Sequence, residues 1–370
     1  MMFPSQFPFV RVTGTPFERG RAYGAAVPER VARSAQIYGS TLKALKVDDA
    51  FRADLIAEFS ERIADFDAHY LEEIKGIADG AGLPVGDVVM INARTEIVAR
   101  ARRKVAGEGC TGAIILPERS ANGALLHGQN WDWRSECVDT AIVLRVERED
   151  GPHILTFTEA GGLARSGLNS AGIAITANYL ECERDFRKSG IPLALLRRKV
   201  LEQENFAEAI RAVVKTPKTC ANNIMLSTAE GFAINFECAP DESFPLLPEN
   251  GMIVHANHWQ SAVALSKLTD TGVHAMPDSY YRDWRVRRLL NEVGPALTLE
   301  DMKAAFHDTF ASPYSVCRPP RPNATGDLSA TVAMLAMEPN RGTMDVIPMP
   351  AVQRSCTQYS LSAEPETIAT

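Results

Sequence analysis

Residues 107–133 read GEGCTGAIILPERSANGALLHGQNWDW, and this stretch decides how the rest of the chain is interpreted. A Gly–Cys step opens an apolar run, a turn-rich segment covers residues 117–123, and a second run leads into Asp132. Two short runs joined by turn residues predict a β-hairpin. The thiol of Cys110 stands at the start of one strand and the Asp132 carboxylate just past the other. We therefore expect the two side chains to lie close together.

The spacing of apolar residues divides the chain into a helical first third and a strand-rich remainder. A short strand and a polar turn at residues 13–16 precede a helix start. Apolar residues then recur three and four apart over residues 27–105, which predicts helices. Residues 88–103 are expected to form one helix with a basic end, which suits a helix C-terminus.

Strand-like runs dominate after Cys110. They cover residues 112–116, 124–129, 140–147, 153–158, 171–178, 222–227, 231–237, 252–256, 328–335 and 343–348. Two helical blocks interrupt them at residues 191–215 and 278–306, and residues 360–370 are expected to be a loose tail. This order predicts antiparallel sheets with helices stacked outside them.

The composition is that of an ordinary globular protein. The chain has 370 residues, 45% of them apolar and 23% charged, which allows one large domain or two ordinary ones. The net charge is −7 and no basic cluster is present, so nucleic acid is not an expected partner. No apolar stretch reaches about 18 residues, and the first residues do not form a secretory signal. We therefore expect no membrane span and no membrane partner.

The seven cysteines are scattered and none has C-x-x-C spacing; they stand at positions 110, 137, 182, 220, 238, 317 and 356. Thiols in a reducing compartment are expected, and hence a cytoplasmic location. A buried apolar role is the expectation for all of them except Cys110. Glycines on both sides of Cys110 allow unusual backbone dihedrals, and we expect this thiol to be partly exposed and able to attack acyl carbons.

Residues 107–112 also fit the pattern G-x-G-x-x-G. A dinucleotide site needs an apolar strand before this pattern and a helix after it. Here a basic helix end precedes it and a strand follows, so we reject a dinucleotide site. No cofactor is expected.

Two further stretches contain candidate site residues. His255 and His258 have a metal-like spacing, but strand alternation would place them on opposite faces and no further ligand cluster is evident, so no metal site is expected. Asn257 between them has an amide that can donate to an oxyanion. Arg318, which follows Cys317, would favour a thiolate and could bind a carboxylate, although from the residues alone a surface arginine is the better explanation.

Four residues are weaker candidates for substrate binding. Trp131 precedes Asp132, and Ser315 opens the segment that contains the arginine. Asn178 and Glu237 stand at strand ends, where a structural cap or turn is the simpler explanation.

Several stretches together resemble one family. They are GTPFERGRAYG at residues 14–24, the two ends of residues 109–132 (GCT and GQNWD), GLNSAG at 167–172, VHANH at 254–258 and SVCR at 315–318. In this order they resemble the acyl-CoA:6-aminopenicillanic acid acyltransferase family, also called peptidase family C45, within the N-terminal-nucleophile hydrolases. The resemblance implies an α+β fold, namely a four-layer αββα sandwich with an amino-terminal helical segment.

The resemblance also implies self-cleavage between Gly109 and Cys110. A mainly helical small piece, residues 1–109, and a catalytic piece, residues 110–370, would then stay associated as one structural domain.

The same resemblance implies roles for single residues. Cys110 would be the nucleophile, Asp132 would orient the new amino terminus, and Asn257 would belong to the oxyanion hole. Arg318 matches an active-site arginine, with Arg321 as its rival.

The sequence thus predicts an enzyme that cleaves a small N-acyl amine or N-acyl amino acid through an acyl thioester on Cys110. The freed α-amine has a reference pKa of about 7.7–8.0 and would be the base, so no catalytic histidine is required. Three alternatives stay open: an acyltransferase that uses acyl-CoA or an amide donor, a papain-like protease that uses His255 or His258, and a non-catalytic scaffold. The expected partner is a small-molecule acyl substrate, and a homo-oligomer is left open.

Overall fold

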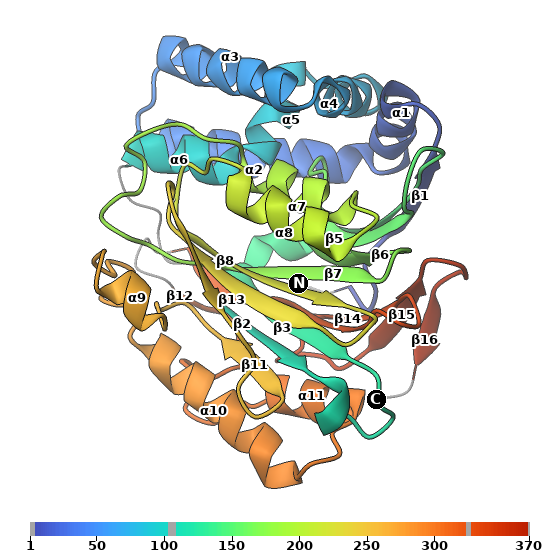
Figure 1. Ribbon diagram of the computed structural model, residues 1–370. Coiled ribbons are helices and arrows are strands. Elements are labelled where there is room, and N and C mark those ends of the chain that lie inside the picture. Colours follow the sequence, from blue (N-terminus) through green and yellow to red (C-terminus); the bar gives the residue numbers. More distant parts are fainter. Residues whose placement is uncertain (1–3, 103–108, 323–326, 369–370) are drawn as a thin grey trace.

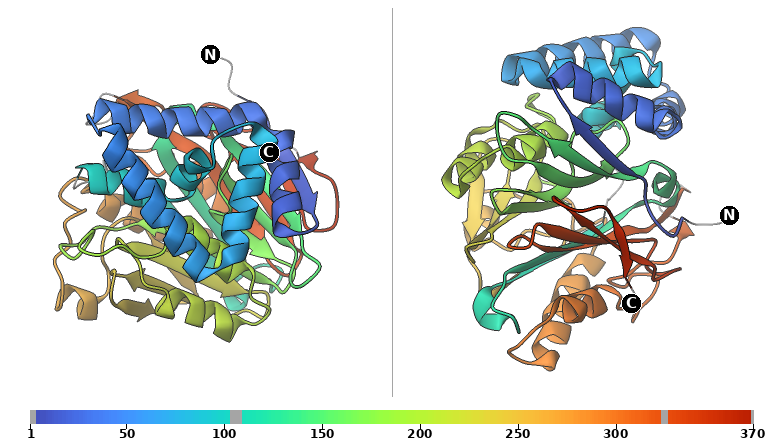
Figure 2. Two further views of the ribbon diagram at one scale, coloured as in Figure 1. Left: turned by 90° about the horizontal axis from the view of Figure 1, so that it is seen from above. Right: turned by 90° about the vertical axis from the view of Figure 1, so that its right-hand side faces the viewer.

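The computed structural model describes residues 4–102, 109–322 and 327–368. Two eight-stranded sheets lie face to face between two layers of helices. Figure 1 shows the amino-terminal helices above the sheets and α10 and α11 below them, and Figure 2 shows the same layers from the side. The expected four-layer αββα sandwich is confirmed. No helix among the described residues is long and apolar enough to cross a membrane.

One sheet contains the first strand of the chain. Its order is β1 (Phe9–Thr13), β4 (Ala141–Glu147), β5 (Ile154–Glu159), β6 (Ser166–Asn169), β7 (Ile173–Tyr179), β8 (Asn222–Thr228), β9 (Ala233–Cys238) and β10 (Ser243–Leu246). All neighbouring pairs are antiparallel except β1 and β4, which are parallel. The segment before Cys110 therefore contributes an edge strand to this sheet.

The other sheet contains the predicted hairpin. Its order is β11 (Met252–His255), β2 (Cys110–Ile115), β3 (Leu126–Arg134), β13 (Leu328–Glu338), β14 (Thr343–Pro348), β15 (Cys356–Ser360) and β16 (Glu366–Ile368), with β12 (Arg321–Pro322) beside β13. β2 and β3 pair antiparallel, and Cys110 lies directly opposite Trp131. Asp132 lies inside β3, not past its end as expected, because pairing with β13 extends this strand to Arg134.

Within residues 4–102, six helices precede the hairpin: α1 (Pro16–Ala26), α2 (Pro28–Ala44), α3 (Asp49–Phe66), α4 (Ala68–Ala81), α5 (Val85–Asn92) and α6 (Arg94–Arg102). The single helix expected over residues 88–103 is wrong, because Ala93 separates α5 from α6. The break has a physical reason in the side chain of Asn92. Its Nδ2 donates to the Gly161 carbonyl at 2.8 Å and its Oδ1 accepts from the Leu163 N–H at 3.0 Å, which fixes the end of α5 on a loop of the sheet.

The later helices cover the outer faces of the sheets. α7 (Leu193–Leu201) and α8 (Phe206–Lys215) contact β6, β7 and β8, whereas α10 (Asp278–Val293) and α11 (Leu299–Phe306) contact β3, β11 and β13. A short helix, α9 (Ala262–Leu265), precedes α10. The loose tail expected at residues 360–370 is wrong for residues 366–368, which pair with β15 as an edge strand.

Polar side chains bridge the two sheets in their interior. His127 on β3 is fully buried and bonds Thr176 on β7 at 2.9 Å and Ser227 on β8 at 2.8 Å. Gln129 on β3 donates to Asn178 on β7 at 2.7 Å. These bonds satisfy buried polar groups and fix how the sheet that carries Cys110 sits on its neighbour.

Candidate active site

The Gly109–Cys110 peptide is held on both sides by hydrogen bonds. The Gly109 carbonyl accepts from the Asp132 N–H at 2.9 Å, and the Cys110 N–H donates to Oδ1 of Asn257 at 2.9 Å. Cys110 is the first residue of β2 and is only 1% exposed, so the expected partial exposure is wrong. The pairing of β2 with β3 places Cys110 opposite Trp131, and both residues belong to the core between the two sheets.

Asp132 and Arg318 lie directly against Gly109. A Cβ atom on Gly109 would stand 2.7 Å from Oδ2 of Asp132 and 2.8 Å from Nη1 of Arg318, so a larger residue would have to displace these side chains. Nε of Arg318 lies 3.3 Å from Oδ2 of Asp132, and Thr331 donates to Oδ1 of Asp132 at 2.6 Å. Oδ2 of Asp132 is buried and has no hydrogen-bond partner among the described residues. A buried carboxylate oxygen, 3.3 Å from Nε of Arg318, therefore lies beside the peptide bond between Gly109 and Cys110.

Arg318, not Arg321, is the arginine that lies against Gly109 and Asp132. Arg318 is 4% exposed, and its Nη2 donates to Asp278. Arg321 is only partly buried, and its guanidinium carbon lies 4.5 Å from the ring centroid of Tyr314. The geometry favours the first of the two candidates.

Arg282 is a central residue that sequence reasoning missed. Its side chain is fully buried on α10, and Nη1 donates to the Cys110 carbonyl at 2.6 Å and to Thr111 at 2.8 Å. Nη2 donates to Oδ1 of Asn257 at 2.8 Å, and Nε donates to Asp278 at 2.9 Å. One guanidinium therefore joins both sides of the Cys110 backbone to α10. The sequence signal was an aspartate four residues before an arginine on a helix, which is usually a surface pair.

The charges around Asp278 are tightly coupled. Burial lowers the pKa of Arg282, and the nearby Arg318 lowers it further. Burial alone would raise the pKa of Asp278, but Arg282 and Arg318 outweigh burial and the net shift is downward. Asp278 is thus held as a carboxylate between two cations.

Asn257 presents its oxygen, not its nitrogen, to Cys110. Oδ1 accepts from the Cys110 N–H and from Arg282, and Nδ2 donates one hydrogen to the Tyr179 carbonyl at 2.8 Å. The backbone N–H of Asn257 donates to Ser279 at 2.6 Å. The expected donation to an oxyanion therefore depends on the second hydrogen of Nδ2.

Of the four weaker candidates, only Trp131 lies beside the thiol. The ring of Trp131 contacts Phe157 edge-on at 5.4 Å between centroids. Asn178 donates to the His255 carbonyl at 2.7 Å and so ties β7 to β11. Ser315 donates to the Cys317 carbonyl at 2.6 Å. The hydrogen bonds of Asn178 and Ser315 hold the framework together.

Glu237 also has structural partners. Its carboxylate accepts from His255 at 2.8 Å and from the backbone N–H groups of Gln260 at 2.5 Å and Ser261 at 2.9 Å. The carboxylate therefore caps the loop that follows β11.

The two histidines lie on the same side of the chain, which corrects the expectation of opposite faces. Their rings stack at 6.2 Å with an interplanar angle of 17°, because β11 ends at His255 and the strand alternation stops there. Nδ1 of His255 bonds the Ala256 carbonyl and Nε2 bonds Glu237, so both ring nitrogens are used by the framework. Burial lowers the pKa of His258 to about 4, so its ring is neutral near pH 7.

The remaining cysteines fit an apolar role. All seven are buried and none forms a disulfide. Burial raises the pKa of Cys317 to about 12 and of Cys356 to about 12, which keeps both as thiols. Within the described ranges, no group of three His, Cys, Asp or Glu side chains is arranged to hold a metal ion.

Comparison with known proteins gives relatives for the chain. A curated relative, the acyl-coenzyme A:6-aminopenicillanic-acid-acyltransferase 40 kDa form of Emericella nidulans, is 31% identical over 318 residues, which is 84% of each chain. The N-acylethanolamine-hydrolyzing acid amidase of Caenorhabditis elegans is 24% identical over 241 residues, which is 60% of each chain.

A solved structure shares the fold. A mutant form of conjugated bile acid hydrolase from Clostridium perfringens matches with a TM-score of 0.50 at 13% identity, over 70% of this chain and 97% of that one. The fold is therefore that of the N-terminal-nucleophile hydrolases.

The family itself follows from the sequence comparison. The family model described as acyl-coenzyme A:6-aminopenicillanic acid acyl-transferase matches residues 119–348, more than half of the chain. Together with the relative at 31% identity, this match shows that the chain is an enzyme and belongs to the acyl-coenzyme A:6-aminopenicillanic acid acyl-transferase family.

Proposed function

We propose that the chain is a self-cleaving cysteine amidohydrolase that acts on a small N-acyl amine or N-acyl amino acid through an acyl thioester on Cys110. One observation carries the proposal: the Cys110 N–H points at Asn257 while Asp132 and Arg318 flank Gly109. Cutting the peptide bond at this position would create an amine that already has its hydrogen-bond partner. A nucleophile and a base would then share one residue.

Self-cleavage needs no group beyond this site and water. The Cys110 thiol adds to the Gly109 carbonyl carbon, the C–N bond breaks, and the acyl group moves from nitrogen to sulfur. Water then hydrolyses the thioester, which releases the Gly109 carboxylate and leaves Cys110 with a free α-amine and a free thiol. Asp132, with its buried Oδ2, is the acceptor that we assign to the new ammonium group.

In the mature enzyme the α-amine takes the proton of the thiol. A group with a reference pKa of about 7.7–8.0 is matched to proton transfer near neutral pH. The thiolate attacks the amide carbonyl of the substrate, and the same proton is returned to the leaving amine. Water then resolves the acyl thioester. Asn257, through its second amide hydrogen, is the side chain that we assign to the oxyanion.

Neither histidine near the site supports a papain-like alternative. Both ring nitrogens of His255 bond framework groups, and Nδ1 of His258 bonds Ser279 at 2.8 Å. The α-amine is therefore the base that we propose.

The two fragments are proposed to stay associated after the cut. β1 pairs with β4 across the division between residues 1–109 and 110–370. The buried Arg198 also pairs with Glu73 at 3.1 Å across the same division.

The cytoplasmic location stays a prediction. It rests on the scattered cysteines, none of which forms a disulfide.

A second candidate function is acyl transfer. The 31% identical relative is an acyltransferase, and transfer shares every step up to the thioester. The two reactions differ only in whether water or an amine attacks the acyl group, and the substrate in both is a small acyl compound.

The test is mass spectrometry of the purified protein with a panel of N-acyl amines, N-acyl amino acids and acyl-CoA thioesters. We expect an acyl adduct on the fragment that begins with Cys110, and free acid as the product. Amide formation with an added amine in preference to free acid would favour the transferase. The absence of any adduct or turnover over the whole panel would contradict both functions.

A further inference from the structure

A buried hydroxyl on α10 holds the backbone of Asn257. The Asn257 N–H donates to Oγ of Ser279 at 2.6 Å, and this oxygen lies 2.8 Å from Nδ1 of His258. Ser279 is fully buried, and His258 is 6% exposed. We refer to these two side chains as the serine–histidine pair. The pair therefore lies directly against the residue assigned to the oxyanion.

The hydrogen bonds of the serine–histidine pair have one consistent direction. A backbone N–H can only donate, so Oγ of Ser279 accepts from Asn257. The hydroxyl hydrogen then goes to Nδ1 of His258, which accepts it when the ring carries its own hydrogen on Nε2. With a hydrogen on Nδ1 instead, the buried hydroxyl hydrogen would have no acceptor among the described residues, at a cost in free energy.

The His258 ring is uncharged near pH 7, as this direction requires. The pKa of His258 is lowered to about 4, first by burial and then by the neighbouring His255 and Arg282. Asp283 and Glu237 oppose this shift but do not outweigh it. A serine hydroxyl inside a helix otherwise tends to bond a carbonyl of the preceding turn. The neutral imidazole offers it a different acceptor and so leaves a lone pair for the Asn257 N–H.

α10 holds Asn257 at two points. Ser279 and Arg282 are three residues apart on the helix and therefore share a face. Ser279 fixes the backbone N–H of Asn257, and Nη2 of Arg282 fixes its Oδ1 at 2.8 Å. Nδ2 donates one hydrogen to the Tyr179 carbonyl at 2.8 Å. With the backbone and both amide atoms fixed, the direction of the second Nδ2 hydrogen is set.

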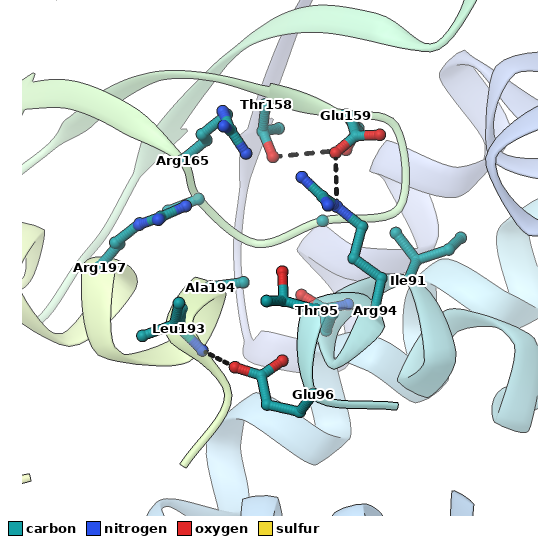
Figure 3. A pocket seen from close by; sticks show the side chains of 13 residues that line it. Ile91, Arg94, Thr95, Glu96, Thr158, Glu159, Arg165, Leu193, Ala194 and Arg197 are labelled. Atoms are coloured by element: carbon teal, nitrogen blue, oxygen red, sulfur yellow. Dashed lines mark hydrogen bonds and ion pairs between the residues drawn. The ribbon is translucent and has the colours of Figure 1, made fainter. Parts of the chain in front are cut away.

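A bond of the same kind joins two helices elsewhere. Figure 3 shows the carboxylate of Glu96 on α6, which accepts from the Leu193 N–H at the start of α7 at 2.9 Å. That bond fixes one helix on another. The bond of Ser279 differs, because the backbone that it holds carries the amide beside Cys110.

We propose that Ser279 and His258 are positioning residues for Asn257. The hydroxyl holds the Asn257 backbone, the imidazole holds the hydroxyl in its accepting orientation, and the second Nδ2 hydrogen is thereby aimed at the oxyanion. In this role His258 accepts a hydrogen bond and takes no proton from the thiol. The effect on turnover rests on the proposed function, because it takes Asn257 as an oxyanion donor. The direction of the hydrogen bonds does not.

The kinetic test uses cut protein and the fastest amide of the N-acyl panel, with hexanoyl p-nitroanilide added to that panel. Ser279→Ala should lower kcat by roughly ten- to a hundredfold, because a catalytic group displaced by about 1 Å loses up to this much. KM should stay unchanged, because the oxyanion forms only in the transition state. The control is Ser34→Ala, which removes a buried hydroxyl that donates to the Arg30 carbonyl at 3.1 Å and should keep the wild-type kcat.

Two substitutions of His258 separate positioning from a role as base. An asparagine oxygen at the place of Nδ1 can accept from Ser279 but cannot take a proton near neutral pH. His258→Asn should therefore keep kcat within about threefold of wild type, since it retains the acceptor. His258→Leu should lose as much as Ser279→Ala. The double variant Ser279→Ala/His258→Leu should be no slower than Ser279→Ala, because the imidazole acts through the hydroxyl.

Four kinetic results would overturn the proposal. They are full kcat in folded Ser279→Ala, equal losses in His258→Asn and His258→Leu, losses that multiply in the double variant, and a loss that lies in KM alone. Melting temperatures identify any variant that does not fold.

Nuclear magnetic resonance of wild-type protein with 15N-labelled histidine tests the hydrogen bonds without turnover. The His258 signals are identified by their loss in His258→Asn. The ring should carry its hydrogen on Nε2 at pH 7 and keep this form at pH 6, where a histidine with the reference pKa of about 6.5 is mostly charged.

The two measurements separate the pair from the proposed function. A hydrogen on Nδ1 of His258 in a protein that hydrolyses amides would overturn the pair and retain the function. A protein that hydrolyses no amide of the panel would refute the function and with it the effect on turnover. The form with hydrogen on Nε2 would then still support the hydrogen bonds to Asn257.

Discussion

At the scale of single residues, Arg282 is the side chain that ties the Cys110 backbone to α10. Its Nη1 bonds the Cys110 carbonyl and its Nη2 bonds Asn257, which in turn holds the Cys110 N–H. We expect Arg282→Gln to slow self-cleavage by at least tenfold, because a buried hydrogen bond to a charged group contributes about 1.5–3 kcal/mol. The fraction of cut chain against time on a denaturing gel measures this.

The control for Arg282 is Arg288 on the same helix. Arg288 is 52% exposed and pairs with Glu292. Arg288→Gln should be cut at the wild-type rate. Equal cleavage rates in both variants would show that the Arg282 contacts do not position the peptide bond.

Asn257 is expected to stabilise the oxyanion that forms when the Cys110 thiolate attacks the substrate amide. Removing one oxyanion donor typically costs about a hundred- to a thousandfold in kcat, and we expect a loss of this size for Asn257→Ala. The rate should be measured on protein that has already been cut, so that slow processing is not mistaken for slow turnover. A folded, cut variant with nearly full kcat would remove Asn257 from the oxyanion hole.

His127 gives the fold a defined response to acid. Burial lowers the pKa of His127 to about 3, whereas the unfolded side chain titrates near 6.5. The unfolded state therefore binds the extra proton between these values. The free energy of unfolding should fall by about 1.4 kcal/mol for each pH unit below 6.5. Above pH 6.5 this contribution is constant.

The measurement is urea unfolding at pH 5 and pH 7 in the Cys110→Ala background, which is expected to stay one chain. His127→Gln should flatten the pH dependence by about 1.4 kcal/mol per unit below 6.5. His69→Gln is the matched control, because His69 is 69% exposed. A wild-type slope in His127→Gln would show that this histidine is not responsible.

The sequence predicted the site residues whose side chains stand in distinctive local motifs. It missed Arg282, which positions the Cys110 backbone through hydrogen bonds. Cys110, Asp132 and Arg318 stand in local patterns that point to the site, and the structure brings them together. Arg282 stands in an ordinary helical pattern, and only the packing of α10 against β11 brings it to Cys110. Contacts between residues that are 172 apart in the chain leave no local signal.

At the scale of elements, the closest contact in the amino-terminal layer joins α1 and α4. Glycines face each other along both helices, at positions 20 and 24 of α1 and 76 and 80 of α4. A Cβ on Gly76 would stand 2.2 Å from the Phe17 carbonyl oxygen, and one on Gly24 would stand 2.2 Å from the Ile77 carbonyl oxygen. The two backbones therefore touch, and a methyl group would have to push the helices apart.

We expect Gly76→Ala to destabilise the protein by about 1–3 kcal/mol, the usual cost of overpacking. Gly39 is the control, because a Cβ there meets nothing within 4 Å and the residue lies inside α2. Gly39→Ala should be neutral or stabilise by up to about 1 kcal/mol. Thermal unfolding of the two variants measures the contrast, and equal melting temperatures would contradict the close contact.

The sequence predicted elements well where periodicity was strong. All ten strand-like runs after Cys110 contain a strand, and both helical blocks are present, each as two helices. The errors lie where a tertiary contact overrides the local pattern. α5 ends at Asn92 because its side chain bonds the loop after β5, and residues 366–368 become a strand because the edge of β15 is available.

At the scale of the whole molecule, the two proposed fragments are interleaved, not merely adjacent. Figure 2 shows β1, the first strand, lying along the sheet formed by later residues. Buried charges also cross the division, as in the pair of Arg94 and Glu159 at 2.8 Å. A cut before Cys110 would therefore change the chemistry of one residue without releasing either fragment. The family resemblance implied one structural domain, but neither it nor the periodicity of either segment predicted that β1 joins a sheet of the later residues.

The central claim is that Cys110 becomes an amino terminus, and intact-mass measurement under denaturing conditions tests it most directly. The wild-type protein should give two masses, those of residues 1–109 and 110–370, while Cys110→Ala should give a single mass for the whole chain. A wild-type preparation that hydrolyses amides and yet shows only the mass of the uncut chain would contradict the account.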